Sequence, residues 1–502
     1  MSKKLSVIGI DSLDPHIIAR FREQLPNFSK MIDQSPTFIS QSIFPVDTIP
    51  AWNSIYTGLK PENHGALYVY DVFDPNLSDL HQLDTSNIRE VTFWDRISNE
   101  GLKTAVIYPM LMYPAWDING VMVSKSPFDK RINWLETEIE IDTFPKSAKS
   151  NYNIPETLKS LWGGFPGQKS LEEWSNIGKQ VLEKEKEMGM NIYNRKEWDF
   201  FFIYFSLLDI IQHRLWRFFD ENDPTYPGKT NLKSVILDYY KFFDDLLGEM
   251  IRLDPERGLM VISDHGHKIR PIKTVNINEY LKREKYLFLK GKNRKIYSKM
   301  RVLMLETANK LNLEHFLIKL IVKNKRLTKM SKSVYSSSGS IDTNKSLAYL
   351  SNFAGMKSYS YGGIEINREL VSEQEYERIR EKIISKVLQL NTDENLINFI
   401  DKRENLFKGK FTKEIFPDIV FELKPDYCVG WDMNSDLKGR SYDHNVASGG
   451  HGKDAVFLVS NFEKTVKRDE ISLIDIAPTI LDYFNINYSE INFDGASIFG
   501  EP

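Results

Sequence analysis

The chain has 502 residues, 41% hydrophobic and 27% charged, a composition that excludes a mainly disordered or fibrous protein. Its 69 acids against 66 Lys and Arg leave a formal net charge of −3, so no general nucleic-acid binding is expected. The single cysteine, Cys428, excludes an intramolecular disulfide framework and a cysteine-rich metal site.

The first apolar run, Leu5–Ile10, is too short for the core of a signal peptide, and no small-residue cleavage pattern follows it. No run of 18 apolar residues occurs anywhere in the chain, so no membrane-spanning helix is expected. We therefore expect a cytoplasmic protein.

Short apolar runs bounded by turn residues predict buried strands at Leu5–Ile10, Thr104–Tyr108, Asp199–Phe205, Gly258–Ser263 and Ala455–Ser460. Stretches with helix-like apolar spacing separate them, at Pro155–Trp162, Ser170–Met188 and Leu232–Leu253. Residues 341–425 read as a further strand–helix–strand unit, with its helix at Gln374–Leu390 and a strand at Asp418–Phe421. This alternation favours an α/β sheet with helices on both faces.

A candidate nucleophile, Thr48, lies in the segment Phe44–Gly58. Pro50 fits the first turn of a helix, which places Thr48 at or next to the N-cap. The hydroxyl is then either a simple cap or a nucleophile held where helix N–H groups stabilise anions.

Acidic residues follow three of the predicted strands, and the carboxyl ends of strands are where sites form in open α/β sheets. Asp11 follows the first strand, and Asp264-His265 follows Gly258–Ser263. Asp209 and His213 stand four residues apart after Asp199–Phe205, so a helix there would bring both to one cation.

A glycine-rich segment between residues 443 and 454 contains two candidate histidines. His444 competes with His451 for a role, and the glycines that flank His451 favour it because they permit close approach to a site.

Taken together, the candidate site contains three carboxylates, three imidazoles and a hydroxyl, from Asp11, Thr48, Asp209, His213, Asp264, His265 and His451. This mixture of hard and borderline ligands suits two divalent metal ions, with zinc favoured and manganese as the alternative. Two such cations would clamp a phosphoryl group and acidify the threonine hydroxyl.

Residues 281–333 carry 16 Lys and Arg against three acids, with apolar spacing typical of basic amphipathic helices. Three interpretations stay open. The segment is a solvated helical face, a lid that attracts a polyanionic substrate, or a surface for peripheral membrane contact. The last would suit a lipid-linked phosphodiester.

The order of these motifs resembles the alkaline phosphatase superfamily, and within it the type I phosphodiesterase/nucleotide pyrophosphatase branch. The matching pieces are Gly9-Ile-Asp11, Thr48-Ile-Pro50, Asp209-x-x-x-His213, Ser263-Asp-His-Gly266 and Gly450-His-Gly452. The resemblance implies a three-layer α/β/α sandwich with an inserted cap. The implied domains are a core from 1–280 with a helical insertion at about 125–195, a cap from 281–430, and the rest of the core from 431–502.

The resemblance also implies roles for the candidate residues. Asp209, His213 and His451 would hold one metal, and Asp11, Asp264 and His265 the other. Thr48 would be the nucleophile beside the second metal and would form a phosphothreonine intermediate.

One position departs from the family pattern, because Val69 stands where nucleotide pyrophosphatases usually carry a phosphate-binding Asn. Asn53 and His267 are candidate substitutes for that contact. We expect a metal-dependent hydrolase of phosphodiester or pyrophosphate bonds in a phosphorylated small molecule or a lipid-linked substrate. The alternatives are a phosphomonoesterase or phosphonate hydrolase on the same scaffold, or a metal-bound binding protein without turnover.

Overall fold

A computed structural model describes, besides the isolated positions 307 and 313, residues 3–35, 38–67, 91–126, 137–161, 166–167, 170–195, 197–290, 341–354, 359–433, 435–441, 444–462, 464, 466–468 and 470–500. These residues form two compact units. The first contains the described residues up to Ala66, those from 91 to Ile269 and those from Gly449 onward. The second contains Leu67 and the described residues of Arg270–Ser448. The division into core and cap at 280 and 430 stays a prediction.

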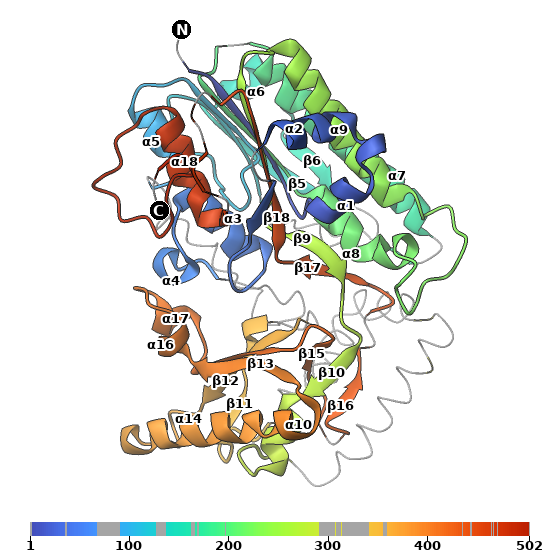
Figure 1. Ribbon diagram of the computed structural model, residues 1–502, viewed down its shortest axis with the longest axis vertical. Helices are drawn as coiled ribbons and strands as arrows, with labels where there is room; N and C mark the ends of the chain where they lie inside the picture. Colours follow the sequence, from blue (N-terminus) through green and yellow to red (C-terminus); the bar gives the residue numbers. More distant parts are fainter. Residues whose placement is uncertain are drawn as a thin grey trace. The chain divides into compact units, whose positions relative to one another are not determined.

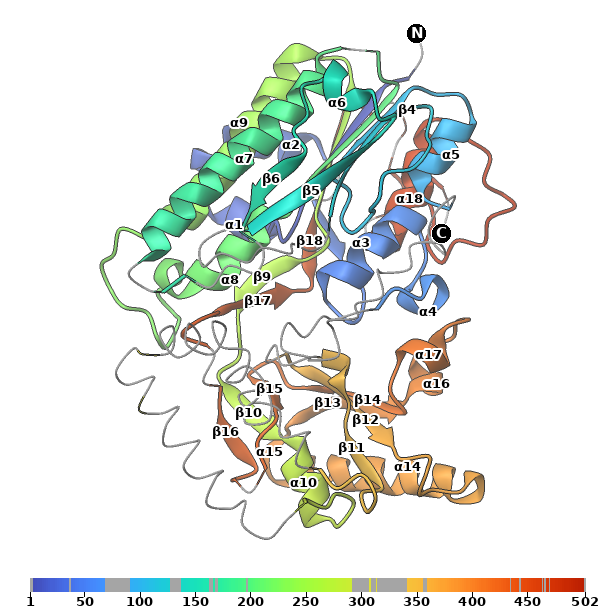
Figure 2. The same ribbon diagram turned by 180° about the vertical axis from the view of Figure 1, so that it is seen from behind.

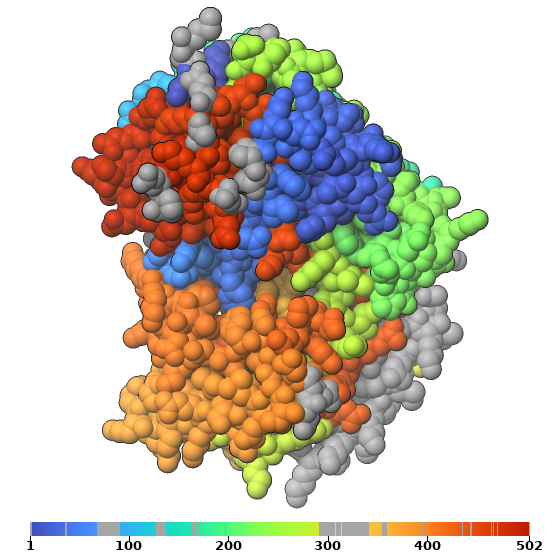
Figure 3. Space-filling model, in the orientation of Figure 1, coloured from blue at the N-terminus to red at the C-terminus, as the bar shows by residue number. Residues whose placement is uncertain are grey.

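Among the described residues of the first unit, nine strands form one mixed sheet. In spatial order they are β2 (Ile39–Gln41), β18 (Asp454–Ser460), β8 (Gly258–Ile262), β1 (Leu5–Ile10), β7 (Phe200–Phe205), β3 (Thr104–Ile107), β4 (Gly120–Lys125), β5 (Thr137–Phe144) and β6 (Thr157–Ser160). The neighbours from β8 to β4 pair in parallel, whereas β2, β18, β5 and β6 pair antiparallel at the two sides. In Figure 3 the blue start and the red end of the chain accordingly lie side by side in this unit.

Two hydrophobic cores cover the two faces of this sheet, because successive side chains of a strand point to opposite faces. In β1, Leu5 and Val7 belong to one core, and Ile8 and Ile10 to the other. The first core is completed by α3 (Thr48–Thr57), α5 (Phe93–Asn99) and α18 (Ile476–Tyr483), and the second by α1 (Pro15–Arg20), α2 (Pro26–Gln34), α7 (Leu171–Tyr193), α8 (Leu207–Phe219) and α9 (Val235–Leu253) (Figures 1 and 2). The predicted three-layer α/β/α sandwich is therefore confirmed.

The five strands predicted from apolar runs are present, and the expected helices at Ser170–Met188 and Leu232–Leu253 are α7 and α9. The helix predicted at Pro155–Trp162 is wrong, because this stretch contains strand β6. The spacing of Leu158 and Leu161 fits a helix, but pairing with β5 decides the outcome.

The expectation of a helical insertion at about 125–195 is corrected in the same way. The segment includes α7 and a short helix, α6 (Ala148–Asn151), but also β5 and β6, which extend the main sheet. In β5, buried and less buried residues alternate, the period of a half-buried strand.

The second unit contains an antiparallel sheet and a smaller mixed sheet. The antiparallel sheet has, in order, β11 (Ala348–Leu350), β12 (Tyr361–Ile366), β14 (Ile419–Leu423) and β13 (Ile397–Lys402). Helix α14 (Glu373–Leu388) packs on it through Tyr376, Ile379 and Ile383. The smaller sheet has β15 (Tyr427–Gly430), β10 (Lys273–Asn276) and β16 (Lys438–Arg440), and the short helices are α10 (Ile277–Arg283), α15 (Leu390–Glu394), α16 (Arg403–Leu406) and α17 (Thr412–Ile415).

Most of the basic segment 281–333 lies outside the described residues, which reach Lys290 and include only positions 307 and 313 beyond it. Its predicted helices and its three interpretations therefore stay predictions. Within the described part of the chain, no helix is long and apolar enough to cross a membrane.

Candidate active site

Three neighbouring parallel strands bring the predicted acids to one edge of the sheet. Strand β1 lies between β8 and β7, paired in parallel with both. Asp11 follows β1, Asp264 follows β8, and Asp209 lies in the first turn of α8 after β7. All three carboxylates are buried, so the predicted convergence at the carboxyl ends of the strands is present.

The first group consists of Asp11, Asp264 and His265, whose ligand atoms lie within 4.8 Å of one another. His265 Nε2 is 3.1 Å from Asp264 Oδ2 and 3.7 Å from Asp11 Oδ1. Thr48 Oγ1 lies 3.4 Å from Asp11 Oδ1 and 3.2 Å from His265 Nε2. The structure therefore brings the candidate nucleophile to this group.

The local sequence explains how Thr48 is held. Thr48 is the first residue of α3, directly after the N-cap Asp47, and Pro50 stands in the first turn, where its missing N–H costs nothing. Gly58 ends the helix in the left-handed region at φ 69°. A Cβ on Gly58 would lie 2.6 Å from the Phe493 ring, so the helix end is fitted closely to its surroundings.

The second group consists of Asp209, His213 and His451, also with ligand atoms within 4.8 Å. Asp209 Oδ1 is 3.2 Å from His213 Nε2 and 3.6 Å from His451 Nε2. Asp209 and His213 share one face of α8, as their spacing predicted. His451 reaches them from β17 (Gly449–Gly452), which pairs with β9 (Gly266–Ile269).

Backbone carbonyls fix the orientation of the three imidazoles. Nδ1 of His213 lies 2.8 Å from Gly449 O, Nδ1 of His451 lies 3.0 Å from Val46 O, and Nδ1 of His265 lies 3.0 Å from Gly266 O. A carbonyl only accepts, so in each case Nδ1 donates and the Nε2 lone pair points into a group. This arrangement is typical of histidines that bind a metal.

Several buried atoms fit cations in both groups. Nε2 of His213 and Nε2 of His451 lie 3.0 Å apart, although the carbonyl contacts make both of them acceptors. Asp209 Oδ1 and Asp264 Oδ2 are buried and accept no hydrogen bond from the residues that the structure describes. A cation in each group would compensate these lone pairs, which are costly to bury unpaired.

The two groups are neighbours rather than separate sites. The rings of His265 and His451, one from each group, stack with centroids 3.8 Å apart and an interplanar angle of 23°. One substrate group at this position can therefore contact both.

Mutual repulsion and burial shape the protonation of the three acids. Burial raises the pKa of Asp11 well above its ordinary value, and the charges of Asp264 and Asp209 raise it further. Burial raises the pKa of Asp264 to about 6. Burial also acts to raise the pKa of Asp209, but His213, with His451 and His265, outweighs it and lowers that pKa. Cations beside the acids would favour the ionised forms.

Sequence reasoning missed two residues that support the first group. Tyr204 donates a hydrogen bond of 2.5 Å from its hydroxyl to Asp11 Oδ2, and Ser12 donates from its backbone N–H to Asp264 Oδ1 at 3.0 Å. Tyr204 is the one polar side chain of the buried strand Phe200–Phe205, and a buried tyrosine hydroxyl usually has a partner. A single tyrosine in an otherwise apolar buried strand was therefore the sequence signal that could have identified Tyr204.

The remaining candidates from the sequence are Asn53, His267 and His444, and none of them belongs to either group. Asn53 donates to Ile49 O within its own helix at 2.8 Å, and no contact among the described residues links it to either group. His267 lies beside the second group, with Nδ1 3.8 Å from Asp209 Oδ1. His444, the competitor of His451, belongs to the second unit and to neither group.

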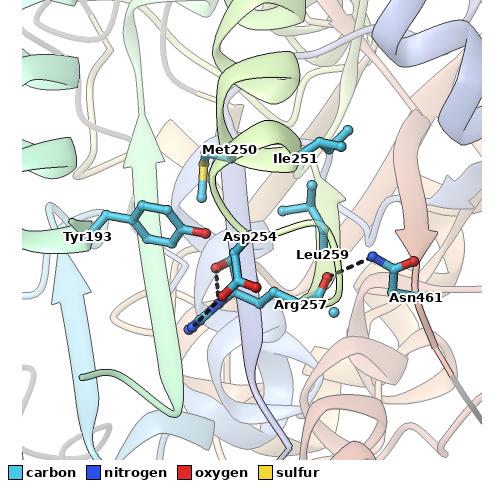
Figure 4. A pocket seen from close by; sticks show the side chains of 9 residues that line it. Tyr193, Met250, Ile251, Asp254, Arg257, Leu259 and Asn461 are labelled. Atoms are coloured by element: carbon cyan, nitrogen blue, oxygen red, sulfur yellow. Dashed lines mark hydrogen bonds and ion pairs between the residues drawn. The ribbon is translucent and has the colours of Figure 1, made fainter. Parts of the chain in front are cut away.

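A small cavity at the opposite, amino ends of the strands is a structural feature (Figure 4). It encloses about 10 Å³, room for about one water molecule. Arg257 closes it by donating to Ser6 Oγ at 2.7 Å, Trp198 O at 3.0 Å and Leu5 O at 3.1 Å. Its hydrogen bonds join the amino ends of β1, β7 and β8.

Comparisons with known proteins agree with this architecture. Two solved structures are similar: phosphonoacetate hydrolase from Sinorhizobium meliloti 1021 in complex with phosphonoformate, and human ectonucleotide pyrophosphatase/phosphodiesterase 5. The hydrolase shares 14% identity at a TM-score of 0.52, with 95% of this chain and 94% of that chain covered. The human protein shares 13% identity at a TM-score of 0.51, with 98% and 97% covered. At such identities the likeness shows the fold alone.

The family itself is shown by sequence. A search of curated proteins found no significant match. The model of the type I phosphodiesterase/nucleotide pyrophosphatase family, in contrast, matches residues 5–452. That span contains both acid–histidine groups and Thr48. The chain therefore belongs to the type I phosphodiesterase/nucleotide pyrophosphatase family and is a phosphoester hydrolase of that type.

Proposed function

We propose that the protein hydrolyses phosphodiester or pyrophosphate bonds with Thr48 as the nucleophile and two divalent cations. The observation that carries the proposal is the position of Thr48 Oγ1, 3.4 Å from Asp11 Oδ1 and 3.2 Å from His265 Nε2. The hydroxyl is buried at the first turn of α3, where backbone N–H groups lack partners within the helix. A negatively charged phosphoryl group would be stabilised there.

The cations would be held by the two groups, Asp11, Asp264 and His265 in one and Asp209, His213 and His451 in the other. Once bound, they would polarise the phosphoryl oxygens and lower the pKa of the Thr48 hydroxyl. Carboxylate and imidazole ligands suit zinc first and manganese second.

The reaction follows from the placement of the side chains. Thr48 Oγ1 would give its proton to water and form a bond to phosphorus, while the bond to the leaving oxygen breaks and that oxygen takes up a proton. A water molecule then attacks the phosphothreonine, the bond from phosphorus to Oγ1 breaks, and Thr48 regains a proton. The stacking of the His265 and His451 rings, one from each group, supports a mechanism in which both groups act on one phosphoryl group.

Charge favours a diester over a monoester. The two groups contain three carboxylates, so two divalent cations would leave one net positive charge among the ligands. A phosphodiester carries one negative charge and matches this, whereas a fully ionised monoester carries two. The second candidate is a phosphonate hydrolase, suggested by the shared fold of phosphonoacetate hydrolase.

The test compares bis-p-nitrophenyl phosphate, p-nitrophenyl phosphate and phosphonoacetate. The protein is stripped with a chelator and reloaded with zinc or manganese. Metal-dependent turnover that prefers the diester supports the proposal, and preference for the monoester or the phosphonate selects an alternative.

Thr48→Ala and Thr48→Ser form the matched pair. The alanine variant should lose at least about 1,000-fold in kcat, because it has no nucleophile, while its metal content is unchanged. The serine variant keeps a hydroxyl and should retain part of the activity. Undiminished turnover by Thr48→Ala would exclude the mechanism.

A further inference from the structure

His267 is a third histidine beside the Asp209, His213 and His451 group, and the proposed mechanism does not use it. It lies in β9 directly opposite His451 in β17 and is 4% exposed. Its ring packs against His213 at a centroid distance of 4.9 Å and against Trp216 at 5.0 Å. The His267 ring therefore packs directly against the ring of the candidate ligand His213.

Hydrogen bonds hold both the backbone and the ring of His267. The backbone N–H of His267 donates to Asp14 Oδ2 at 2.9 Å, and its Nδ1 lies 2.7 Å from Ser12 Oγ. The Ser12 hydroxyl donates its single hydrogen to Gly266 O at 3.2 Å. Nδ1 of His267 must then carry a hydrogen and donate it to Ser12.

The same contacts argue against His267 as a direct metal ligand. With Nδ1 engaged by Ser12, the remaining lone pair is on Nε2, and Nε2 faces the backbone of Gly449, where a Cβ would lie 2.2 Å from it. His267 is accordingly a member of neither ligand group among the described residues. The distance of 3.8 Å from its Nδ1 to Asp209 Oδ1 is too long for a hydrogen bond, so His267 lies beside this carboxylate without bonding to it.

His267 also sets how closely β17 approaches the group. A Cβ on Gly449 would lie 2.2 Å from His267 Nε2 and 2.5 Å from Gln212 O, so only glycine fits against this ring. Gly449 O is the acceptor that orients His213 Nδ1 at 2.8 Å. A change in the His267 ring would thus move the carbonyl that aims His213.

We propose that His267 is a positioning residue, which holds His213 and Asp209 in the orientation that binds a cation without ligating it. This inference rests on the proposed function, because it assumes that the group binds a metal. Loss of such a supporting contact typically lowers metal affinity by about 10–100-fold.

The test measures zinc affinity by competition with a chromophoric chelator. In the wild type, two zinc sites are expected. Asp209→Asn and Asp264→Asn identify which affinity belongs to which group. His267→Leu should weaken the Asp209 site by about 10–100-fold and leave the other site unchanged. His267→Asn, which retains a donor near Nδ1, should recover part of the affinity.

His64→Leu is the matched control. His64 is as buried as His267, at 4% exposed, and its imidazole bonds to Ser54 Oγ and to the backbone N–H of Ala66. Losing it should leave both zinc affinities unchanged. Melting temperatures of the metal-free variants separate a loss of fold from a loss of metal.

The outcomes distinguish a failure of the positioning role of His267 from a failure of the proposed function. Unchanged zinc affinity in His267→Leu, or equal weakening of both sites with an intact fold, overturns the positioning role. If His267→Leu does not fold, His267→Asn and Ser12→Ala decide the question, and unchanged affinity in both overturns it. A wild type that binds neither zinc nor manganese overturns the proposed function itself, which a failure confined to the His267 variants does not.

Discussion

Gly449→Ala should disable the Asp209, His213 and His451 group without touching a candidate ligand. The new Cβ would lie 2.2 Å from His267 Nε2 and 2.5 Å from the backbone oxygen of Gln212. Ordinary contacts begin at about 3.4 Å, so β17 must retreat by roughly 1 Å. The backbone of α8 has little freedom to give way.

The displacement of β17 would affect two candidate ligands, His213 and His451. The hydrogen bond of 2.8 Å from His213 Nδ1 to Gly449 O would stretch beyond useful length, and His451, two residues along the same strand, would move with it. We expect about 10–100-fold weaker zinc binding at one site and a comparable or larger loss in kcat/KM for the diester.

Gly452→Ala is the matched control in the same strand. Its Cβ would meet its nearest neighbour, Gly266 C, at 3.4 Å, an ordinary contact. Zinc competition and diester hydrolysis are measured for both variants, with circular dichroism to check the fold. Equal zinc affinities and rates in the two variants would refute the argument from close approach.

Three further predictions concern the buried polar groups. Tyr204→Phe removes the donor to Asp11 Oδ2 but keeps the ring, and should lower the free energy of unfolding by about 1.5–3 kcal/mol in urea titrations; an unchanged midpoint and slope would contradict this. Burial, with the Asp418 charge next, raises the pKa of Glu365 to about 7, so the wild type should lose stability as pH rises from about 4.5 through 7. Glu365→Gln should therefore be more stable by about 1–3 kcal/mol at pH 8 and equal near pH 4, and a pH-independent difference would disprove the cause. Chelator treatment of the wild type should lower its melting temperature and readdition of zinc restore it, because a cation that binds only the folded state stabilises it; no shift would argue against metal binding.

The sequence predicted much of the site, because its signals are local. Apolar runs predicted the positions of the strands. The acids that follow these strands lie at one edge of the sheet, because the carboxyl ends of parallel strands share that edge. The spacing of Asp209 and His213 needed only a helix, and Pro50 indicated the helix start that places Thr48. The structure brings these residues together, while their roles as ligands and nucleophile stay predictions.

Prediction from the sequence failed where pairing with a neighbouring strand decides the secondary structure. Leu158 and Leu161 have the spacing of a helix, but β5 offers a strand to pair with, and tertiary pairing overrides a short pattern. The prediction of a helical insertion at 125–195 failed for the same reason, because this segment also contains strand β5, which pairs within the main sheet.

By itself, then, the sequence determined the family, the α/β class and which candidate residues lie together at one edge of the sheet. The family follows from the order of the motifs, and the other two follow from the periodicity of apolar residues and the positions of the acids after the strands. Only the tertiary structure decided that Tyr204 bonds to Asp11 and that the His267 ring packs against Gly449 beside the second group. These contacts join elements that are distant in sequence, and their distances depend on how strands and helices pack, which no local pattern encodes.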